Sequence, residues 1–323
     1  MQNDCAQQGH KAAFVETPGG EVHYLQAGSG RPMLLIHGLV GSSLNWCRNI
    51  EALAREATVY AIDLVNTGKS ERVRGIDAGV EATADRVAEF MDALGLDEAD
   101  IAGHSHGGAV AVMLAARHPE RVRSLILFAP ANPYSDVTDT LVRAYRTRLG
   151  RLVAQAAPYL PAWLQRYALG RMYGDRARIV SGTLDRYVNG LRLPGSVDHI
   201  MAIVDSWFAD MARLKAVLPR LATIPTLLVW GDRDRAVSVA SGIRLRDELP
   251  ASQIIAVPGA GHVVFEEMPE EANRLMLDWL RRDPVANRLV APEHESAALQ
   301  RYDSPVSDAT VAGSAMETLP TSS

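Results

Sequence analysis

The sequence predicts an α/β fold in which a mostly parallel sheet is covered by helices on both faces. Three observations support this prediction: short apolar runs recur along the chain, segments with helical periodicity separate them, and 47% of the 323 residues are hydrophobic. Apolar runs without alternation are typical of strands buried on both faces. A chain of this length can enclose a large core, either as one big domain or as two smaller ones.

The elements follow one another in a regular order. Two strands are expected around the Pro-Gly-Gly turn within residues 12–28. The apolar runs predicted as further strands are residues 32–38, 57–63, 99–105, 122–130, 224–232 and 252–262. Helices are expected over residues 80–96, from residue 107 to just before Pro119, and over residues 269–282. Gly95 can stop the first helix, and Pro119 ends the second.

The expected domain division depends on where this alternation stops. Residues 133–218 contain no good strand, but they hold nine of the nineteen aromatic residues and twelve basic against seven acidic residues. We expect them to form a helical cap inserted into a core of residues 13–132 and 219–282. Residues 1–12 are expected to be an N-terminal leader. Residues 283–323 are rich in Ser, Thr, Ala and Pro, which predicts a disordered tail.

Composition excludes several classes of function. The net charge of −5 argues against a nucleic-acid-binding protein. The polar N-terminus lacks a secretory signal, and no run reaches the roughly 18 apolar residues that span a bilayer. We therefore expect a cytoplasmic protein without stable membrane insertion. The two cysteines, Cys5 and Cys47, do not suggest a disulfide framework, and no Cys/His cluster suggests a metal site.

The segment Gly103-His104-Ser105-His106-Gly107 matches G-x-S-x-G, a sharp strand-to-helix turn that presents a nucleophilic serine. The predicted strand before it and the helix after it support this interpretation. Side chains next to the serine leave so tight a turn in other directions, so neither neighbouring histidine is expected to act as the base. His104 is expected to pack as a structural residue. The backbone N–H of His106 is a candidate donor to an oxyanion.

The base and the acid are expected further along the chain. His262 follows the last predicted strand on a glycine-flanked loop, at the sheet edge where the nucleophile is expected. Asp232 and Asp234 follow the preceding strand. We favour Asp234 as the acid because it lies further into the loop, whereas Asp232 is expected to cap the turn. The competing position after residues 122–130 offers Asn132 and no acid before Asp136.

A second oxyanion donor is expected after the strand at 32–38. Gly38 and Gly41 allow the backbone to present the N–H of Leu39, and His37 is expected to support this loop. We expect the substrate pocket to be lined by a small set of residues from the core and the cap. They are His37, Gly38, Trp163, Trp207, Phe208 and Val263.

These motifs resemble those of the α/β-hydrolase superfamily, in particular its capped serine esterases and related hydrolases. The resemblance covers residues 13 to 282 and rests on "HGLVGS", "GHSHGG", "PTLLVWGDRD" and "GAGH", in the usual order. It implies the α/β-hydrolase fold with a helical cap. It also implies Ser105 as nucleophile, His262 as base and Asp234 as acid, in agreement with the reading of the residues themselves.

The sequence departs from its relatives at two places. Many relatives carry D-x-x-G-x-G-x-S where this chain has "DLVNTGKS", so Asn66 and Thr67 replace the usual Gly-x pair. The residue after the nucleophile is often Met, Leu or Gln, and His106 makes the expected pocket more polar. A serine at 105 argues against the haloalkane dehalogenase and epoxide hydrolase branches, which use an aspartate.

The expected activity is hydrolysis of carboxylic esters through an acyl-enzyme, without a metal or organic cofactor. The expected partner is a small, apolar ester. Three alternatives stay open: a carbon–carbon bond hydrolase of dienoic keto acids, a cofactor-free haloperoxidase, and a non-catalytic ligand receptor on the same fold. The first would need basic groups inside the pocket to hold a carboxylate. The oligomeric state is not predicted.

Overall fold

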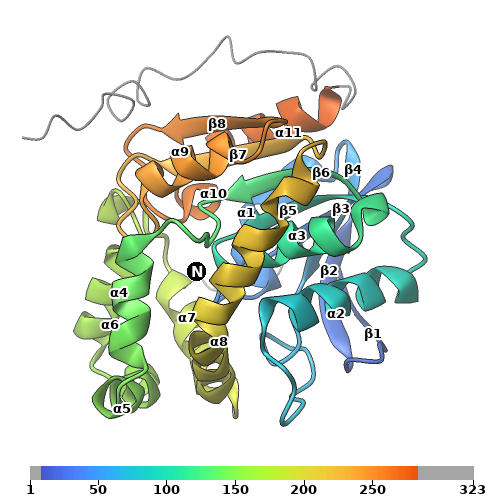
Figure 1. Ribbon diagram of the computed structural model, residues 1–323. Helices are drawn as coiled ribbons and strands as arrows, with labels where there is room; N and C mark the ends of the chain where they lie inside the picture. Colours follow the sequence, from blue (N-terminus) through green and yellow to red (C-terminus); the bar gives the residue numbers. More distant parts are fainter. Residues whose placement is uncertain (1–8, 283–323) are drawn as a thin grey trace, which may run out of the picture.

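The computed structural model describes residues 9–282, and its centre is one eight-stranded sheet (Figure 1). Most of the expected leader and the whole of the expected tail lie outside the described residues. The strand order is β1-β2-β4-β3-β5-β6-β7-β8. β1 pairs with β2, and β2 with β4, in antiparallel fashion, whereas all other neighbours run parallel. The prediction of a mostly parallel sheet is confirmed.

The strands form where the apolar runs predicted them, with ends that differ by a few residues. They are β1 (Lys11–Val15), β2 (Val22–Ala27), β3 (Arg31–Ile36), β4 (Ala57–Ile62), β5 (Ala99–His104), β6 (Val122–Phe128), β7 (Thr226–Gly231) and β8 (Ser252–Val257). Every residue of β5 and β7 is buried. These strands are buried along their whole length because helices cover the sheet on both sides.

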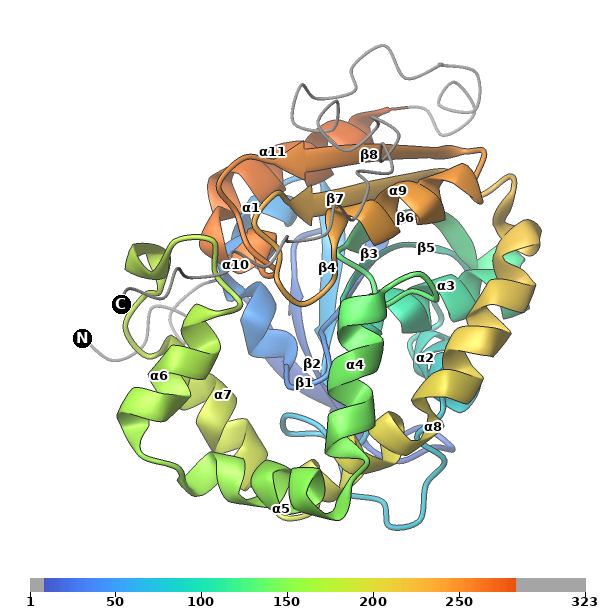
Figure 2. The same cartoon turned by 60° about the vertical axis from the view of Figure 1, so that its left-hand side comes forward.

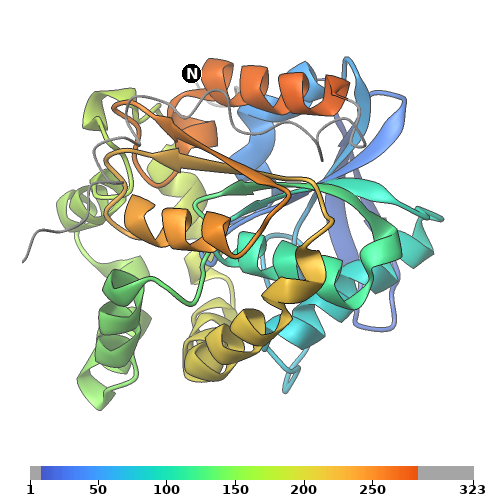
Figure 3. The same cartoon turned by 45° about the horizontal axis from the view of Figure 1, so that its top comes forward.

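Two layers of helices enclose the sheet (Figure 3). One apolar cluster joins α2 (Val80–Ala93), α3 (His106–Arg117) and α9 (Val239–Asp247) to one face. A second cluster joins α1 (Cys47–Leu53), α10 (Val264–Glu267) and α11 (Pro269–Arg281) to the other face. Gly95 has φ +65° just after α2, as a stop signal requires. α3 ends before Pro119, whose ring is incompatible with a helix interior.

Residues 133–218, between β6 and β7, form the helical insertion, and in the described part of the chain they contain no strand. Its helices are α4 (Asp136–Tyr145), α5 (Arg148–Ala156), α6 (Ala162–Gly170), α7 (Thr183–Arg192) and α8 (Ser196–Val217). Figures 1 and 2 show α4 to α7 beside the sheet, while α8 runs back across the molecule toward α3. Trp207, Met211 and Leu214 of α8 belong to the same apolar cluster as α3. The insertion is therefore joined to the core through α8.

Two further features complete the description. Cys47, at the start of α1, is disulfide-bonded, so the expectation from cysteine usage is wrong at this position. Within residues 9–282, no helix combines the length and the apolar character that crossing a membrane requires.

Candidate active site

Ser105 lies on a strained turn between β5 and α3. Its backbone has φ +51° and ψ −118°, a conformation that residues with a Cβ rarely adopt. The flanking glycines make the turn possible. A Cβ on Gly107 would lie 2.2 Å from the carbonyl oxygen of His37, and a Cβ on Gly103 would lie 2.6 Å from that of Gly107. The turn therefore needs these glycines, as the G-x-S-x-G pattern indicated.

His262 and Asp234 meet at the carboxyl edge of the sheet. The Nδ1 of His262, after β8, lies 2.8 Å from the Oδ2 of Asp234, after β7. The Oδ1 of Asp234 accepts hydrogen bonds from the backbone N–H groups of Ala236 and Val237. A carboxylate held in this way fixes the imidazole tautomer that carries its proton on Nδ1 and leaves Nε2 unprotonated.

The two other side chains considered for this role, Asp232 and Asn132, make other contacts. Asp232 accepts a hydrogen bond from the backbone N–H of Gly259, at 2.7 Å, and so joins the loops after β7 and β8. Asn132 donates to the carbonyl oxygen of Pro130 and to the hydroxyl of Ser241. Asp234 is thus the side chain, of those considered from the sequence, that the structure pairs with His262.

His104 brings the serine turn and the histidine loop together. Its ring packs against that of His262 with centroids 4.7 Å apart, and its Nε2 lies 3.1 Å from the His262 carbonyl oxygen. Burial, and then the nearby His262, hold the pKa of His104 well below its usual range. A neutral His104 donates its Nε2 proton to that carbonyl. His104, which directly precedes Ser105 in the chain, therefore joins the serine turn to the loop of His262.

The loop after β3 is folded by its own side chains. Gly41 N–H donates to the carbonyl oxygen of Gly38, and Ser42 N–H donates to Oδ1 of Asn45. His37 lies within 2.7 Å of the Gly38 carbonyl oxygen through Nδ1 and accepts from Leu64 N–H through Nε2. His37 thus connects this loop to the segment after β4. The first-turn N–H of His106 has no partner within its own helix, as at every helix start.

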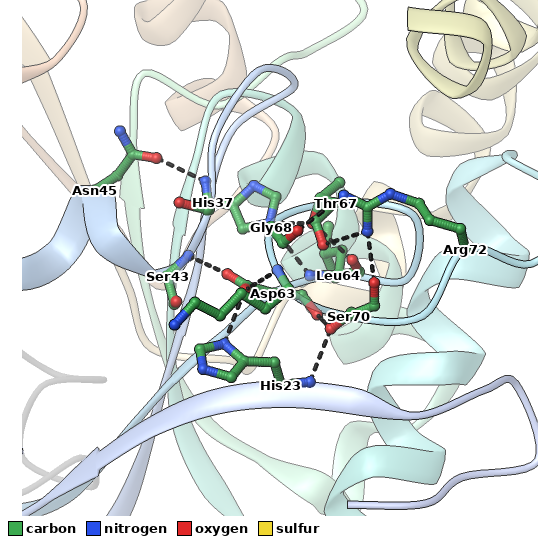
Figure 4. A network of polar contacts seen from close by, with 12 residues as sticks. His23, His37, Ser43, Asn45, Asp63, Leu64, Thr67, Gly68, Ser70 and Arg72 are labelled. Carbon is green, nitrogen blue, oxygen red and sulfur yellow. Dashed lines mark hydrogen bonds and ion pairs between the residues drawn. The ribbon is translucent and has the colours of Figure 1, made fainter. Parts of the chain in front are cut away.

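Asp63, at the end of β4, holds the base of this loop (Figure 4). It accepts hydrogen bonds from the backbone N–H groups of Ser43 and Lys69, and its Oδ2 lies 2.8 Å from His23 Nδ1. Burial alone would raise the pKa of Asp63, but these hydrogen bonds outweigh burial and lower it. The charged carboxylate therefore anchors the loop that carries Leu39.

The two residues that depart from the D-x-x-G-x-G-x-S pattern lie in the same network. Asn66 has φ +69°, the conformation for which relatives use glycine, and its side-chain amide exchanges hydrogen bonds with the backbone of Val73. The Nδ2 of Asn66 also lies 3.3 Å from Nδ1 of His199 on α8. Thr67 Oγ1 lies 2.9 Å from Nε2 of His37. Both replacements add polar contacts between the core, the β3 loop and the insertion.

Two buried carboxylates that the sequence did not single out connect the insertion to the His262 loop and to the loop after β3. Glu267 accepts hydrogen bonds from the backbone N–H groups of Gly261, Gly174 and Asp175, and from Arg178. Its side chain is fully buried. Because Gly261 precedes His262, Glu267 fixes the histidine loop against the start of the segment between α6 and α7.

Glu266 makes the corresponding connection to the β3 loop. Its carboxylate accepts from the amide of Asn45 and from the hydroxyls of Tyr173 and Tyr187, and Arg186 lies 3.9 Å away. Burial raises the pKa of Glu266. The available signal in the sequence was two adjacent acids in the apolar stretch after His262, but nothing local identifies their partners.

Glycines allow three loops to touch at this place. A Cβ on Gly231, at the end of β7, would lie 2.2 Å from the carbonyl oxygen of Gly261. A Cβ on Gly261 would lie 2.4 Å from the N of Gly174, and one on Gly174 would lie 2.4 Å from the carbonyl oxygen of Gly259. The loop after β8 therefore meets both the end of β7 and the insertion backbone to backbone, and we call this contact the glycine junction.

A pair of neutral histidines lies beside the serine turn. Burial, followed by the nearby His199, lowers the pKa of His106 to about 3. Burial, followed by Arg86 and Arg72, lowers the pKa of His199 to about 4. Among the described residues, Nε2 of His106 is a buried atom without a hydrogen-bond partner. An unsatisfied buried nitrogen beside the serine turn is available to a polar group of a bound molecule.

The remaining expected pocket residues lie in different environments. Val263 is buried next to His262, and Trp207 is buried with Nε1 donating to Asp139. Phe208 is half-buried beneath the guanidinium groups of Arg143 and Arg146. Trp163 is 68% exposed on α6, so most of its ring lies in solvent.

Fold and sequence together define the class of protein. Residues 31–269 match the profile of the alpha/beta hydrolase fold family, so the chain belongs to that family. It is 31% identical over 279 residues to the dihydrolipoyllysine-residue acetyltransferase component of the acetoin cleaving system of Pseudomonas putida, covering 85% of this chain and 70% of the relative. It is also 31% identical to 2-hydroxy-6-oxo-6-phenylhexa-2,4-dienoate hydrolase of Burkholderia cepacia, covering 80% and 91%.

A solved structure agrees with this assignment. The structure of a membrane phospholipase A, described as a bacterial virulence factor, superimposes with a TM-score of 0.71 at 30% sequence identity. The superposition covers 85% of this chain and 88% of that protein. The expected fold class and the resemblance to α/β hydrolases are therefore confirmed.

Proposed function

We propose that this protein hydrolyses carboxylic esters, with Ser105 as nucleophile, His262 as general base and Asp234 as the acid that orients it. One observation carries the proposal: the strained serine turn packs through His104 against the loop on which His262 is hydrogen-bonded to Asp234. Perturbed geometry and paired titratable groups at one sheet edge are typical of a catalytic site.

The reaction proceeds through an acyl-enzyme. His262 Nε2 takes the proton of Ser105 as its Oγ attacks the ester carbonyl carbon, and Asp234 stabilises the resulting imidazolium. The backbone N–H groups of Leu39 and His106 hold the oxyanion, each contributing on the order of 3 kcal/mol. His262 then protonates the leaving alcohol. Water activated by the same histidine attacks the acyl-enzyme and releases the acid.

The basic side chains of the insertion favour an ester over a dienoic keto acid. Nine of its twelve basic side chains are exposed. The three that are half-buried, Arg151, Arg178 and Arg186, pair with Asp205, Glu267 and Glu266 respectively. A dienoic keto acid carries a carboxylate that a buried pocket must neutralise with a cation. An uncharged ester makes no such demand.

We propose that the insertion acts as a cap and supplies the apolar wall of the pocket through Trp207, Phe208 and neighbours, with Val263, His37 and Gly38 on the core side. We leave Trp163 out of this wall because of its exposure. His106 adds a polar position, and its free Nε2 would accept from or donate to an oxygen or nitrogen of the substrate.

The carbon–carbon hydrolase remains the second candidate because relatives carry such names, among them the dienoate hydrolase of Burkholderia cepacia. A panel of p-nitrophenyl esters of increasing acyl length, assayed beside a vinylogous 1,5-diketone, separates the candidates. Ester hydrolysis that Ser105→Ala abolishes, and that Asp234→Asn reduces by on the order of 10⁴, is the expected result.

Other outcomes decide against the proposal. Turnover of the diketone alone identifies the carbon–carbon hydrolase. Binding of either compound without turnover identifies a receptor. A serine-directed phosphonate that leaves Ser105 unlabelled contradicts every reading in which this serine is the nucleophile.

A further inference from the structure

Exposed large apolar side chains are concentrated in residues 141–180, within the insertion. Of the eleven most exposed ones among the described residues, eight fall within residues 141–180. They are Leu141, Leu149, Leu152, Val153, Tyr159, Trp163, Tyr167 and Val180. Four of them, including Leu149 and Trp163, are more than 60% exposed. Large apolar side chains exposed together in one segment call for a partner, because large exposed apolar patches mark interaction sites.

The helix α5 lacks a partner for its apolar face. Leu149, Leu152 and Val153 have the i, i+3, i+4 spacing that places them on one side of the helix, and no residue of α5 is buried. On α6, Trp163 and Tyr167 are four residues apart and share a side in the same way, at 68% and 49% exposure. An amphipathic helix normally buries such a stripe against the core. Here the stripe faces solvent.

The same segment is strongly basic. Residues 141–180 contain eight arginines and a single acidic residue, Asp175, in a chain whose net charge is −5. Arg148 lies one turn from Leu152, and Arg166 lies one turn from Trp163, so cations border both apolar stripes. Arg148 and Arg166 are themselves exposed.

The position of these helices suits contact with an extended surface. In Figures 1 and 2, α5 and α6 lie at the outer edge of the molecule, away from the sheet, where an extended surface can approach them. The combination of leucines, interfacial aromatic rings and bordering arginines matches the chemistry of a bilayer with anionic headgroups.

We infer that α5, η3 (Ala157–Tyr159) and α6 dock this protein on the surface of an anionic lipid bilayer. The leucines and Val153 enter the boundary between headgroups and acyl chains, Tyr159, Trp163 and Tyr167 lie at headgroup level, and the arginines bind lipid phosphates. The contact is peripheral and does not span the bilayer. It does not depend on the proposed ester hydrolysis.

The test is sedimentation of the full chain with vesicles. We expect vesicles of phosphatidylcholine with one third phosphatidylglycerol to bind at least about tenfold more protein than pure phosphatidylcholine vesicles, because each arginine near an anionic surface adds to the attraction. High salt should weaken this binding, since it screens the charges.

Two variants separate the apolar and the ionic contributions. The double substitution Leu149→Ser with Leu152→Ser, and separately Arg148→Gln with Arg166→Gln, should each reduce vesicle binding several-fold. Phe14→Ser and Arg74→Gln, at exposed positions of the core, are matched controls that should bind as the wild type does. Hydrolysis of a water-soluble p-nitrophenyl ester should be unchanged in all four, which shows that the folded site is intact.

The inference is overturned if anionic vesicles do not bind the wild type, or if both test variants bind like the controls. It is also overturned if the variants leave vesicle binding unchanged but alter the molar mass in solution, because the patch is then an interface between copies of this chain. Loss of ester hydrolysis in the wild type with vesicle binding retained contradicts the proposed function alone.

Discussion

At the scale of single residues, the serine turn stores conformational strain. Ser105 is held at φ +51° between two glycines that permit the close approach of the backbone. Backbones in such sparsely populated regions typically cost on the order of 1–3 kcal/mol, and they persist where the surroundings enforce them. The turn at Ser105 therefore lowers the stability of the fold by roughly this amount.

Replacing Ser105 with glycine should release part of this strain. We expect Ser105→Gly to be more stable than Ser105→Ala by about 1 kcal/mol, because glycine adopts positive φ without a steric penalty while alanine does not. Both variants lack the hydroxyl of the proposed nucleophile, so the comparison isolates the backbone. Urea unfolding monitored by circular dichroism measures the difference. Equal unfolding midpoints for the two variants would show that the turn is unstrained.

At the scale of elements, adjacent carboxylates of α10 hold the His262 loop and the loop after β3. Glu267 fixes the His262 loop through Gly261, and Glu266 reaches the β3 loop through Asn45. Both also bind the segment between α6 and α7, through Gly174 and Tyr173. Any movement of that segment is therefore transmitted to both loops.

Removing the charge of Glu267 should lower both stability and kcat, although Glu267 is not expected to contact the substrate. In Glu267→Gln the amide would point a donor at backbone N–H groups, so we expect a loss of on the order of 3 kcal/mol in stability. We also expect kcat to fall at least about tenfold with little change in KM, because His262 is displaced. Glu270→Gln is the matched control, since Glu270 is exposed on α11.

The measurement combines steady-state kinetics with the rate of phosphonate labelling of Ser105. A purely structural role would lower stability alone and leave the labelling rate of the folded fraction at its normal value. That outcome would show that Glu267 does not position His262.

At the scale of the whole molecule, neutral histidines are enclosed where the core meets the insertion. His106 lies on α3, His199 on α8, and His37 and His104 on the adjoining loop and strand; burial lowers the pKa of all four. α8 also contributes apolar residues to the core cluster. Unfolding exposes these imidazoles to water, where they can bind protons at their ordinary pKa.

Stability should therefore decline in mild acid. The folded pKa of His106 is about 3 and the ordinary value is 6.5, so between these values the unfolded chain binds a proton that the folded chain does not. The free energy of unfolding then rises with pH, and it falls as the pH drops through this window. Asp63 acts in the same direction because its pKa is lowered, whereas the raised pKa of Glu266 acts oppositely.

The variant His106→Met isolates one contribution. We expect its unfolding free energy to depend less steeply on pH than that of the wild type between neutral and mildly acidic pH. Urea midpoints at a series of pH values provide the measurement. Parallel curves for the two proteins would mean that His106 is not a source of the acid sensitivity.

The sequence predicted the fold well because local signals determine it. Apolar runs gave the strands, and Gly95 and Pro119 marked the ends of helices where the structure has them. The pairing of His262 with Asp234 was also expected, since glycine-flanked loops after parallel strands meet at one edge. Their catalytic roles stay predictions until the proposed assays are done.

What the sequence did not reveal depends on contacts between distant residues. Glu266 and Glu267 looked like ordinary acids before a helix. Apart from Gly261, which is six positions from Glu267, the partners named above lie about 80 to more than 200 positions away. The exposure of Trp163 and the engagement of Arg178 and Arg186 likewise follow from how the insertion packs. The disulfide state of Cys47 was misjudged because cysteine count and position alone do not determine pairing.

The glycine junction has a consequence for anyone who builds chimaeras of this protein. A graft that exchanges residues 133–218 for the corresponding region of a relative brings a foreign residue against Gly259 and Gly261, where the backbone leaves no room for a Cβ. Unless the donor sequence also has glycine at the position of Gly174, we expect the backbones at the glycine junction to move apart and to displace His262. Choosing donors by the residue at the position of Gly174 should distinguish chimaeras that hydrolyse substrate from chimaeras that only fold.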